Sequence, residues 1–136
     1  MAKIRHIAIR VEDVEAVAHF FQAAFGLELV QRRPNGPIDL SDGDVNLTLL
    51  PLTLGNQQYR PGEIRPGYAH IGFSVEDEDE THRRLEALGA TTMPAPAPGG
   101  HAYYEKKYRG IEGLYLDVGH WVGARPLEQP AATAAE

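Results

Sequence analysis

The sequence predicts an α+β fold made of two βαβββ modules in tandem. Three observations support this: a short segment is repeated 64 residues further on, a helix pattern follows each copy, and three strand-like segments follow each helix. Repetition at a fixed offset is typical of folds built from similar modules. The chain has 136 residues, which fits one domain holding both modules.

The repeated segment opens each module. Residues 4–13 read IRHIAIRVED and residues 68–77 read YAHIGFSVED, so both copies contain His-Ile-x-x-x-Val-Glu-Asp. Apolar residues alternate with other residues in both copies, which is the pattern of a strand with one buried face. The same order of elements after each copy makes a chance echo a poor explanation.

A helix is predicted after each copy, over residues 13–25 in the first module and 79–88 in the second. Each begins at an aspartate and is followed by a glycine, Gly26 or Gly89. Aspartate is a preferred N-cap and glycine a preferred residue after the last turn. Apolar residues keep a helical period clearly in the first helix and more weakly in the second.

Three short strands are expected after each helix, separated by Pro and Gly turns. In the first module they cover residues 27–33, 36–41 and 45–52. In the second module they cover residues 90–93, 101–107 and 113–118.

The modules are predicted to span residues 4–52 and 68–119, within a single domain over residues 1–125. Segment 53–67 is polar and rich in Pro and Gly, as expected of a linker. Residues 126–136 are predicted to form a flexible tail.

Composition narrows the class of protein. A net charge of -6 argues against nucleic acid as a partner, because phosphates require a basic face. No run of about 18 apolar residues is present, so no membrane contact is expected. The N-terminus shows no leader pattern, and a cytoplasmic location is expected. Without cysteine, disulfides and thiolate metal sites are excluded, so any metal must have nitrogen and oxygen ligands.

Strand alternation predicts which polar side chains share a face. In the first strand, His6 and Arg10 lie opposite the apolar residues that should pack on the helix, and His70 does the same in the fifth strand. In the last strand, Tyr115 and Asp117 point away from the apolar set.

The repeat relates four positions on this face: His6, Thr48, His70 and Asp117. Three are good metal ligands, whereas the Thr48 hydroxyl is a poor one. Two imidazoles and one carboxylate form a facial triad that leaves coordination sites for water or substrate. The alternative is that these are unconnected polar residues on a solvated sheet face.

Three segments resemble the vicinal oxygen chelate superfamily: RHIAIRVEDVEAVAHFFQAAFGLEL, AHIGFSVED and GIEGLYLDV. This superfamily includes glyoxalase I, methylmalonyl-CoA epimerase, fosfomycin-resistance and bleomycin-resistance proteins, and extradiol dioxygenases. The resemblance covers residues 4–119. It implies a curved mixed sheet that forms a cup around one metal ion, which binds vicinal oxygens of a substrate and stabilises an enolate-like or oxyanion intermediate.

Two positions depart from the family pattern. The last ligand is usually glutamate, and here it is Asp117; the usual acidic or amide ligand of the first half is replaced by Thr48. These changes disfavour the activities of glyoxalase I and the epimerase themselves. A three-ligand site resembles that of extradiol dioxygenases and fosfomycin-resistance enzymes.

Two further residues are predicted to handle protons. Extradiol enzymes carry a tyrosine at a comparable distance before the last ligand, which suggests Tyr108 as a hydrogen-bond donor to substrate, with His101 as an outer acid–base group. The alternative is that HAYYEKKY is an ordinary strand. Glu112 is interpreted as a turn residue. It is the alternative metal ligand if Asp117 does not bind the ion.

Arg10, Thr48 and Tyr115 share the face of the three ligand candidates and are expected to contact the substrate, Arg10 by attracting an anion. Lys107 is interpreted as part of a solvated edge. Trp121 is expected to pack at a domain or dimer surface.

The sequence thus predicts a metal-dependent enzyme, glyoxalase-like or extradiol-dioxygenase-like, acting on a small oxygenated molecule. Its cofactor would be one divalent ion of Fe, Mn, Ni, Co or Zn. A homodimer is expected, because two such modules leave exposed sheet edges. The alternative is a metal-free protein that binds a drug or metabolite, as bleomycin-resistance proteins do.

Overall fold

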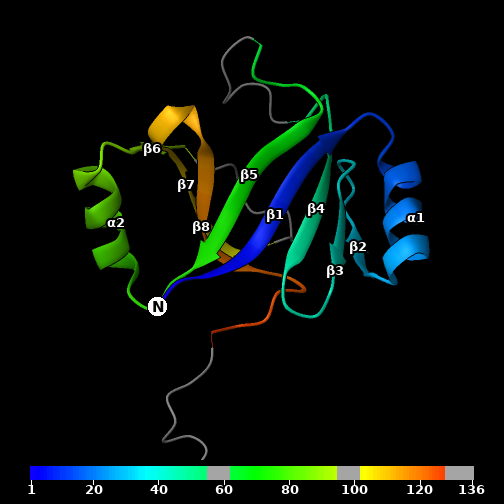
Figure 1. Ribbon diagram of the computed structural model, residues 1–136, viewed down its shortest axis with the longest axis horizontal. Coiled ribbons are helices and arrows are strands. Elements are labelled where there is room, and N and C mark those ends of the chain that lie inside the picture. Colours follow the sequence, from blue (N-terminus) through cyan, green and yellow to red (C-terminus); the bar gives the residue numbers. More distant parts are fainter. Residues whose placement is uncertain (55–61, 95–101, 128–136) are drawn as a thin grey trace, which may run out of the picture.

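The computed structural model describes residues 1–54, 62–94 and 102–127, and in these residues the chain forms eight strands and two α-helices (Figure 1). The first module contains β1 (Lys3–Val11), α1 (Val14–Phe25), β2 (Glu28–Arg32), β3 (Ile38–Ser41) and β4 (Asn46–Pro51). The second contains β5 (Gly67–Ser74), α2 (Glu78–Ala87), β6 (Thr91–Met93), β7 (Ala102–Arg109) and β8 (Tyr115–Trp121). The predicted βαβββ order is confirmed in both.

All eight strands belong to one mixed, curved sheet in the order β2-β3-β4-β1-β5-β8-β7-β6. The first strands of the two modules, β1 and β5, pair antiparallel at its centre. Each of them also pairs in parallel with the last strand of its own module, β4 or β8. The two modules therefore join side by side, and β2 and β6 are the outer strands.

The strand register confirms the predicted equivalence of Thr48 and Asp117. Ala8 pairs with Thr48 across β1 and β4, and Gly72 pairs with Asp117 across β5 and β8. Because Ala8 and Gly72 are related by the 64-residue repeat, their partners are related too.

The helices pack on one side of the sheet and leave the other side for polar groups. The apolar residues of α1 and the first module form a cluster around Ala18, Ile38, Leu40 and Leu49. In the second module Val75, Tyr108 and Val118 form a smaller cluster, to which α2 contributes Leu85. Figure 1 shows α1 beside the strands of the first module and α2 beside those of the second, so the helices lie at opposite ends of the sheet.

Most element boundaries follow the predicted caps. Asp13 caps α1 by accepting a hydrogen bond from the Ala16 amide, and Gly26 ends it at φ 70°. The predicted start of α2 at Asp79 is wrong, since Asp77 is the N-cap. The last strand also starts later and ends later than predicted, because residues 111–113 form a 3-10 turn with Glu112 at φ 58°.

No helix in the described ranges has the length and apolar character needed to cross a membrane.

Candidate metal centre

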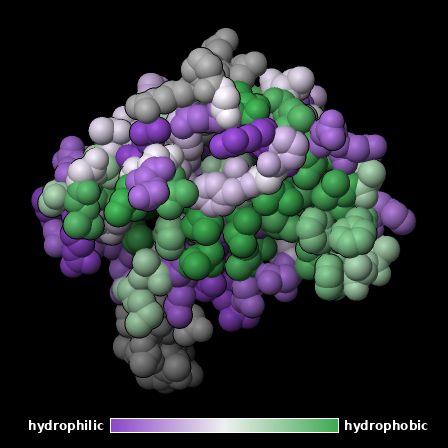
Figure 2. Space-filling model, turned by 45° about the horizontal axis from the view of Figure 1, so that its top comes forward, coloured by the Kyte–Doolittle hydropathy of each residue, from purple (hydrophilic) through white to green (hydrophobic). Residues whose placement is uncertain are grey.

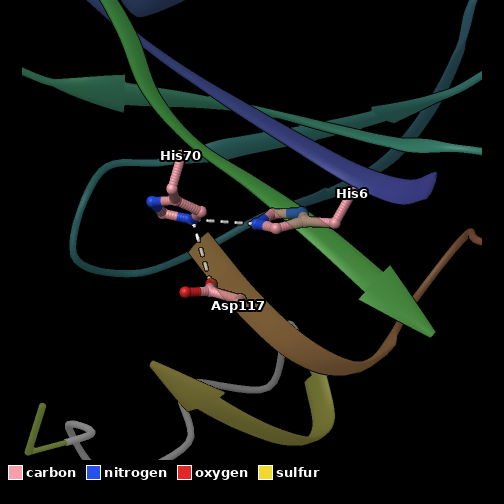
Figure 3. Close-up of side chains that lie close together, drawn as sticks. All are labelled: His6, His70 and Asp117. Carbon is pink, nitrogen blue, oxygen red and sulfur yellow. Dashed lines mark hydrogen bonds and ion pairs between the residues drawn. The ribbon is translucent and has the colours of Figure 1, made fainter. Parts of the chain in front are cut away.

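Three predicted ligands, on three neighbouring strands of the sheet, converge on one another (Figure 3). His6 Nε2 lies 3.0 Å from His70 Nε2, and His70 Nε2 lies 3.2 Å from Asp117 Oδ2. One ligand atom from each residue lies within 4.8 Å of those of the other two. The predicted convergence of these side chains is confirmed.

The convergence follows from the pairing of three adjacent strands. In β1 and β5, His6 pairs with Gly72 and Ala8 pairs with His70, so the histidines sit diagonally across the antiparallel ladder. Gly72 pairs in turn with Asp117 on β8. The side chains at these positions all point to one face of the sheet, and the glycine leaves room between them.

Burial sets the electrostatics of this cluster. His6, His70 and Asp117 are each at most 6% exposed. Burial, with a smaller contribution from the charge of Lys107, holds the pKa of His70 well below its usual value. Burial also raises the pKa of Asp117 to about 8, although Lys107 opposes that shift. The imidazole of His70 is therefore neutral where its Nε2 lies 3.2 Å from Asp117 Oδ2.

The hydrogen bonds around His6 favour a metal ligand. Asn46 donates through its Nδ2 to the Val122 carbonyl at 2.8 Å, so its Oδ1 is the atom that faces His6 Nδ1, at 2.7 Å. His6 therefore carries a proton on Nδ1, and a lone pair on Nε2 points toward His70 and Asp117.

The distances between the candidate ligand atoms also fit a metal site. Two ligands at 90° and about 2.1 Å from one metal ion are about 3.0 Å apart, close to the 3.0 and 3.2 Å found here. Two histidines and one carboxylate are a donor set suited to divalent first-row metals. The cluster thus fits the divalent ion that the sequence predicts.

Trp121 lies in this site, and its predicted place at a domain or dimer surface is wrong. Its ring stacks on the His6 ring at 4.7 Å between centroids and 10° between planes. Its Nε1 donates to Glu105 Oε2 at 2.8 Å, and 1% of the residue is exposed. The strand β8 continues to residue 121, so Trp121 shares the face of Asp117.

Lys107 is also part of the site, which corrects its interpretation as a solvated edge residue. Its Nζ lies 3.0 Å from Asp117 Oδ2 and 3.8 Å from Glu105 Oε1, and 8% of the residue is exposed. In β7 it pairs directly with Asp117 of β8. The signal in the sequence was strand alternation, which places Lys107 on the same face of the sheet as Asp117.

Thr48 belongs to a buried network beside His6. Its hydroxyl lies 2.6 Å from Asp39 Oδ1 and 2.8 Å from Asn46 Oδ1. Arg33 donates to both oxygens of Asp39, at 2.8 and 2.9 Å. The Thr48 side chain is 1% exposed and engaged within the protein, so its predicted contact with substrate is not supported by its position.

The other predicted substrate contacts lie on the same face. Arg10 is buried, and its Nη1 donates to the Leu54 carbonyl at 2.7 Å. The Tyr115 hydroxyl donates to Glu63 Oε1 at 2.6 Å, and Glu63 also accepts from Arg109 at 3.3 Å. Glu63 belongs to the segment predicted as a linker, so part of that segment lies against the second module.

The structure describes one of the two predicted proton handlers, Tyr108, and places it away from the three candidate ligands. Tyr108 pairs with Leu116 and points to the helix side, where its hydroxyl lies 2.9 Å from His82 Nδ1. Strand parity therefore places Tyr108 on the face opposite Lys107 and Asp117. His101 lies outside the described residues. Glu112 is exposed in the 3-10 turn, as the turn interpretation predicted.

The sequence of this chain is similar to those of known enzymes. The chain is 26% identical to lactoylglutathione lyase of Neisseria meningitidis serogroup B over 105 residues, covering 73% of this chain and 75% of the relative. The same identity and coverage hold for the serogroup A protein.

Solved structures show the same fold. Methylmalonyl-CoA epimerase from Mycobacterium tuberculosis matches with a TM-score of 0.63 and 19% identity, covering 98% of this chain and 91% of that one. The 2,3-dioxygenase LapB from Pseudomonas sp. KL28 matches with a TM-score of 0.66 and 16% identity, covering 95% of this chain and 44% of that one. The model of the glyoxalase/bleomycin resistance protein/dioxygenase superfamily matches residues 3–113, so the chain belongs to that superfamily, as the sequence motifs predicted.

Proposed function

We propose that this protein is a metal-dependent enzyme of the superfamily that acts on a small oxygenated molecule. His6, His70 and Asp117 would hold one divalent ion. The observation that carries the proposal is the convergence of two imidazole nitrogens and one carboxylate oxygen in a buried position. Buried polar groups gathered in this way are costly unless something compensates them, and a divalent cation does so.

The protein residues have separate tasks in this proposal. The bound ion would act as a Lewis acid on a substrate with two neighbouring oxygens. His6 is held in place by Asn46 and by the Trp121 ring, which also fills the space over Gly72. Lys107 holds Asp117 through its ammonium group and adds positive charge beside the site. The site is largely closed to water, which strengthens these electrostatic interactions.

Two residues are proposed to contact the substrate. Arg10 is a buried cation on β1, the strand that carries His6. Tyr115 lies two residues before Asp117 on the same face of β8. Together with Lys107 they favour a substrate that carries negative charge or develops it during the reaction. His101 remains a proposed acid–base group.

A second function, the metal-free binding of a drug or metabolite, has a specific observation in its favour. The Lys107 ammonium group, 3.0 Å from Asp117 Oδ2, provides that carboxylate with a cation from the chain itself. Thr48, at the position equivalent to Asp117, supplies no strong fourth ligand. A metal-free protein that binds a drug or metabolite in the cup would have both features.

Metal analysis of protein purified without a histidine tag separates the two functions. The enzyme proposal expects about one tightly bound divalent ion per chain. Iron would indicate oxygen chemistry, whereas zinc, nickel or manganese would indicate lyase, isomerase or transferase chemistry. Trp121 is the single tryptophan and stacks on His6, so its fluorescence should report binding of added Ni²⁺ or Co²⁺. Protein that contains no metal and shows no fluorescence response to added ions would favour the binding protein.

A further inference from the structure

The two histidines of the site make different hydrogen bonds. His6 Nδ1 lies 2.7 Å from Asn46 Oδ1. His70 Nδ1 is buried and has no hydrogen-bond partner among residues 1–54, 62–94 and 102–127. The repeat relates these two residues, so the difference comes from their surroundings rather than from their positions in the fold.

The surroundings differ at the last strand of each module. Asn46 on β4 pairs directly with His6 on β1. The equivalent position on β8 is occupied by Tyr115, whose hydroxyl bonds to Glu63. The second module therefore has no counterpart of the Asn46 amide to hold His70.

The orientation of the Asn46 amide is fixed by its neighbours. Its Nδ2 faces two acceptors, the Val122 carbonyl at 2.8 Å and Asp39 Oδ1 at 3.4 Å. Asp39 is itself held by Arg33 through two hydrogen bonds. A flipped amide would bring its oxygen against these two acceptors, so the orientation that presents Oδ1 to His6 is strongly favoured.

This orientation determines where the protons lie. Asn46 Oδ1 can only accept, so a neutral His6 carries its proton on Nδ1 and a lone pair on Nε2. His70 Nε2 lies 3.0 Å from His6 Nε2, the atom with that lone pair, and 3.2 Å from Asp117 Oδ2. Two lone pairs at 3.0 Å would repel, so His70 Nε2 carries the proton and donates it to His6 Nε2 when no metal is bound.

We infer that Asn46 is a positioning residue that presets His6 as a metal ligand, and that His70 has to change its tautomer when metal binds. This inference rests on the proposed metal site. In the preset tautomer, His6 offers Nε2 to a metal with no rearrangement. His70 must move its proton from Nε2 to Nδ1 before its Nε2 can bind. Groups that orient metal-binding histidines in this way contribute strongly to metal affinity.

The proton positions can be measured directly by long-range ¹H–¹⁵N correlation spectra of ¹⁵N-labelled protein at about pH 8, where an ordinary imidazole is neutral. Without metal, His6 should carry its proton on Nδ1 and His70 on Nε2. With Zn²⁺, His6 should be unchanged and His70 should carry its proton on Nδ1. A proton on His6 Nε2 in the metal-free protein would overturn the inference, and so would a zinc complex in which His70 keeps its original tautomer.

Substitution gives a second test. Asn46→Ala should let His6 populate both tautomers and should weaken Zn²⁺ binding by about 10- to 100-fold. The matched control is Ser74→Ala, which removes another buried hydrogen bond, from Ser74 Oγ to the Gly119 carbonyl at 2.7 Å, and should leave Zn²⁺ affinity unchanged. An Asn46→Ala protein that binds Zn²⁺ as tightly as the wild type would overturn the positioning role.

Failure of the proposed function would look different. Wild-type protein that binds no Zn²⁺ would overturn the metal site and the role assigned to His70. The tautomer of His6 in metal-free protein would still decide whether Asn46 positions that ring.

Discussion

Asp117 is the carboxylate of the candidate triad, and its burial makes its charge unfavourable without a metal. Asp117→Asn should therefore weaken metal binding by at least about 100-fold, since the ion loses its anionic ligand. The metal-free fold should change in stability by no more than about 1 kcal/mol, because a pKa of about 8 leaves the Asp117 carboxyl largely neutral at pH 7, like the amide that replaces it. Metal titration and denaturant unfolding of both proteins measure the two effects.

Asp117→Glu is the companion variant. If the site has adapted to the shorter side chain, the longer carboxylate should crowd the ligands and lower metal affinity; if it resembles the usual family site, glutamate should be tolerated. Unchanged metal content in Asp117→Asn would show that another carboxylate holds the ion, and Glu105, bonded to the Trp121 indole, would be tested next.

The three candidate ligands could be predicted from the sequence because two rules identify them. Strand alternation placed His6, His70 and Asp117 on one face, and the repeat related the two histidines. Tyr108 was chosen by its distance in sequence from Asp117, which ignores parity, and it lies on the other face. Asn46 was missed as a partner of His6 because their contact depends on the parallel pairing of β1 with β4, which no local pattern reveals.

At the scale of elements, Asp39 of β3 and Arg33, which directly follows β2, form a buried ion pair beside the site. Asp39 is fully buried; burial raises its pKa, but the hydrogen bonds and charge of Arg33, with the Thr48 hydroxyl, more than offset this and lower it overall. A carboxyl whose pKa falls on folding stabilises the fold above its unfolded pKa of about 3.9. That contribution is lost as the pH falls through the folded value.

Asp39→Asn should therefore destabilise the protein by about 3 kcal/mol at neutral pH, because Arg33 is left buried without its anionic partner. The difference in free energy of unfolding between wild type and variant should shrink as the pH falls below about 4. Denaturant unfolding between pH 3 and pH 7 measures it. A difference that stays constant over this range would contradict the ion pair.

The packing of the His6 and Trp121 side chains over β5 depends on Gly72. A Cβ atom there would lie 2.6 Å from the Trp121 ring and 2.8 Å from His6 Cβ. Gly72→Ala should cost about 1–3 kcal/mol of stability and shift both rings, so metal affinity should fall as well.

Gly43→Ala is the control for this change. Gly43 has φ 99° and open space around it, so alanine there strains the backbone without touching the site. It should lower stability and leave metal affinity unchanged. Equal metal affinities in the two variants would show that Gly72 has no part in forming the site.

At the scale of the whole molecule, the order of elements was predictable, whereas the ends of several elements were not. The repeat and the capping residues gave α1 closely. The predicted end of the last strand at residue 118 hid the fact that Trp121 continues the face of Asp117. Leu88, the last residue of the predicted helix 79–88, is 83% exposed, since α2 ends at Ala87.

We expect the protein to be a homodimer. Phe20 and Phe25 of α1 are 61% and 69% exposed, and Figure 2 shows apolar surface on the side of the molecule where α1 lies. The outer strands β2 and β6 also leave sheet edges that are usually paired or covered. Light scattering at micromolar concentration should give twice the mass of the 15.0 kDa chain, and a monomer would contradict this expectation.

The central claim is that one divalent ion binds between His6, His70 and Asp117. Its most direct test is a crystal structure of metal-loaded protein with anomalous data collected at the absorption edge of the added metal. We predict one strong anomalous peak per chain, about 2.0–2.4 Å from His6 Nε2, His70 Nε2 and an Asp117 oxygen. An anomalous map with no peak between these atoms, and with Lys107 still paired to Asp117, would contradict it.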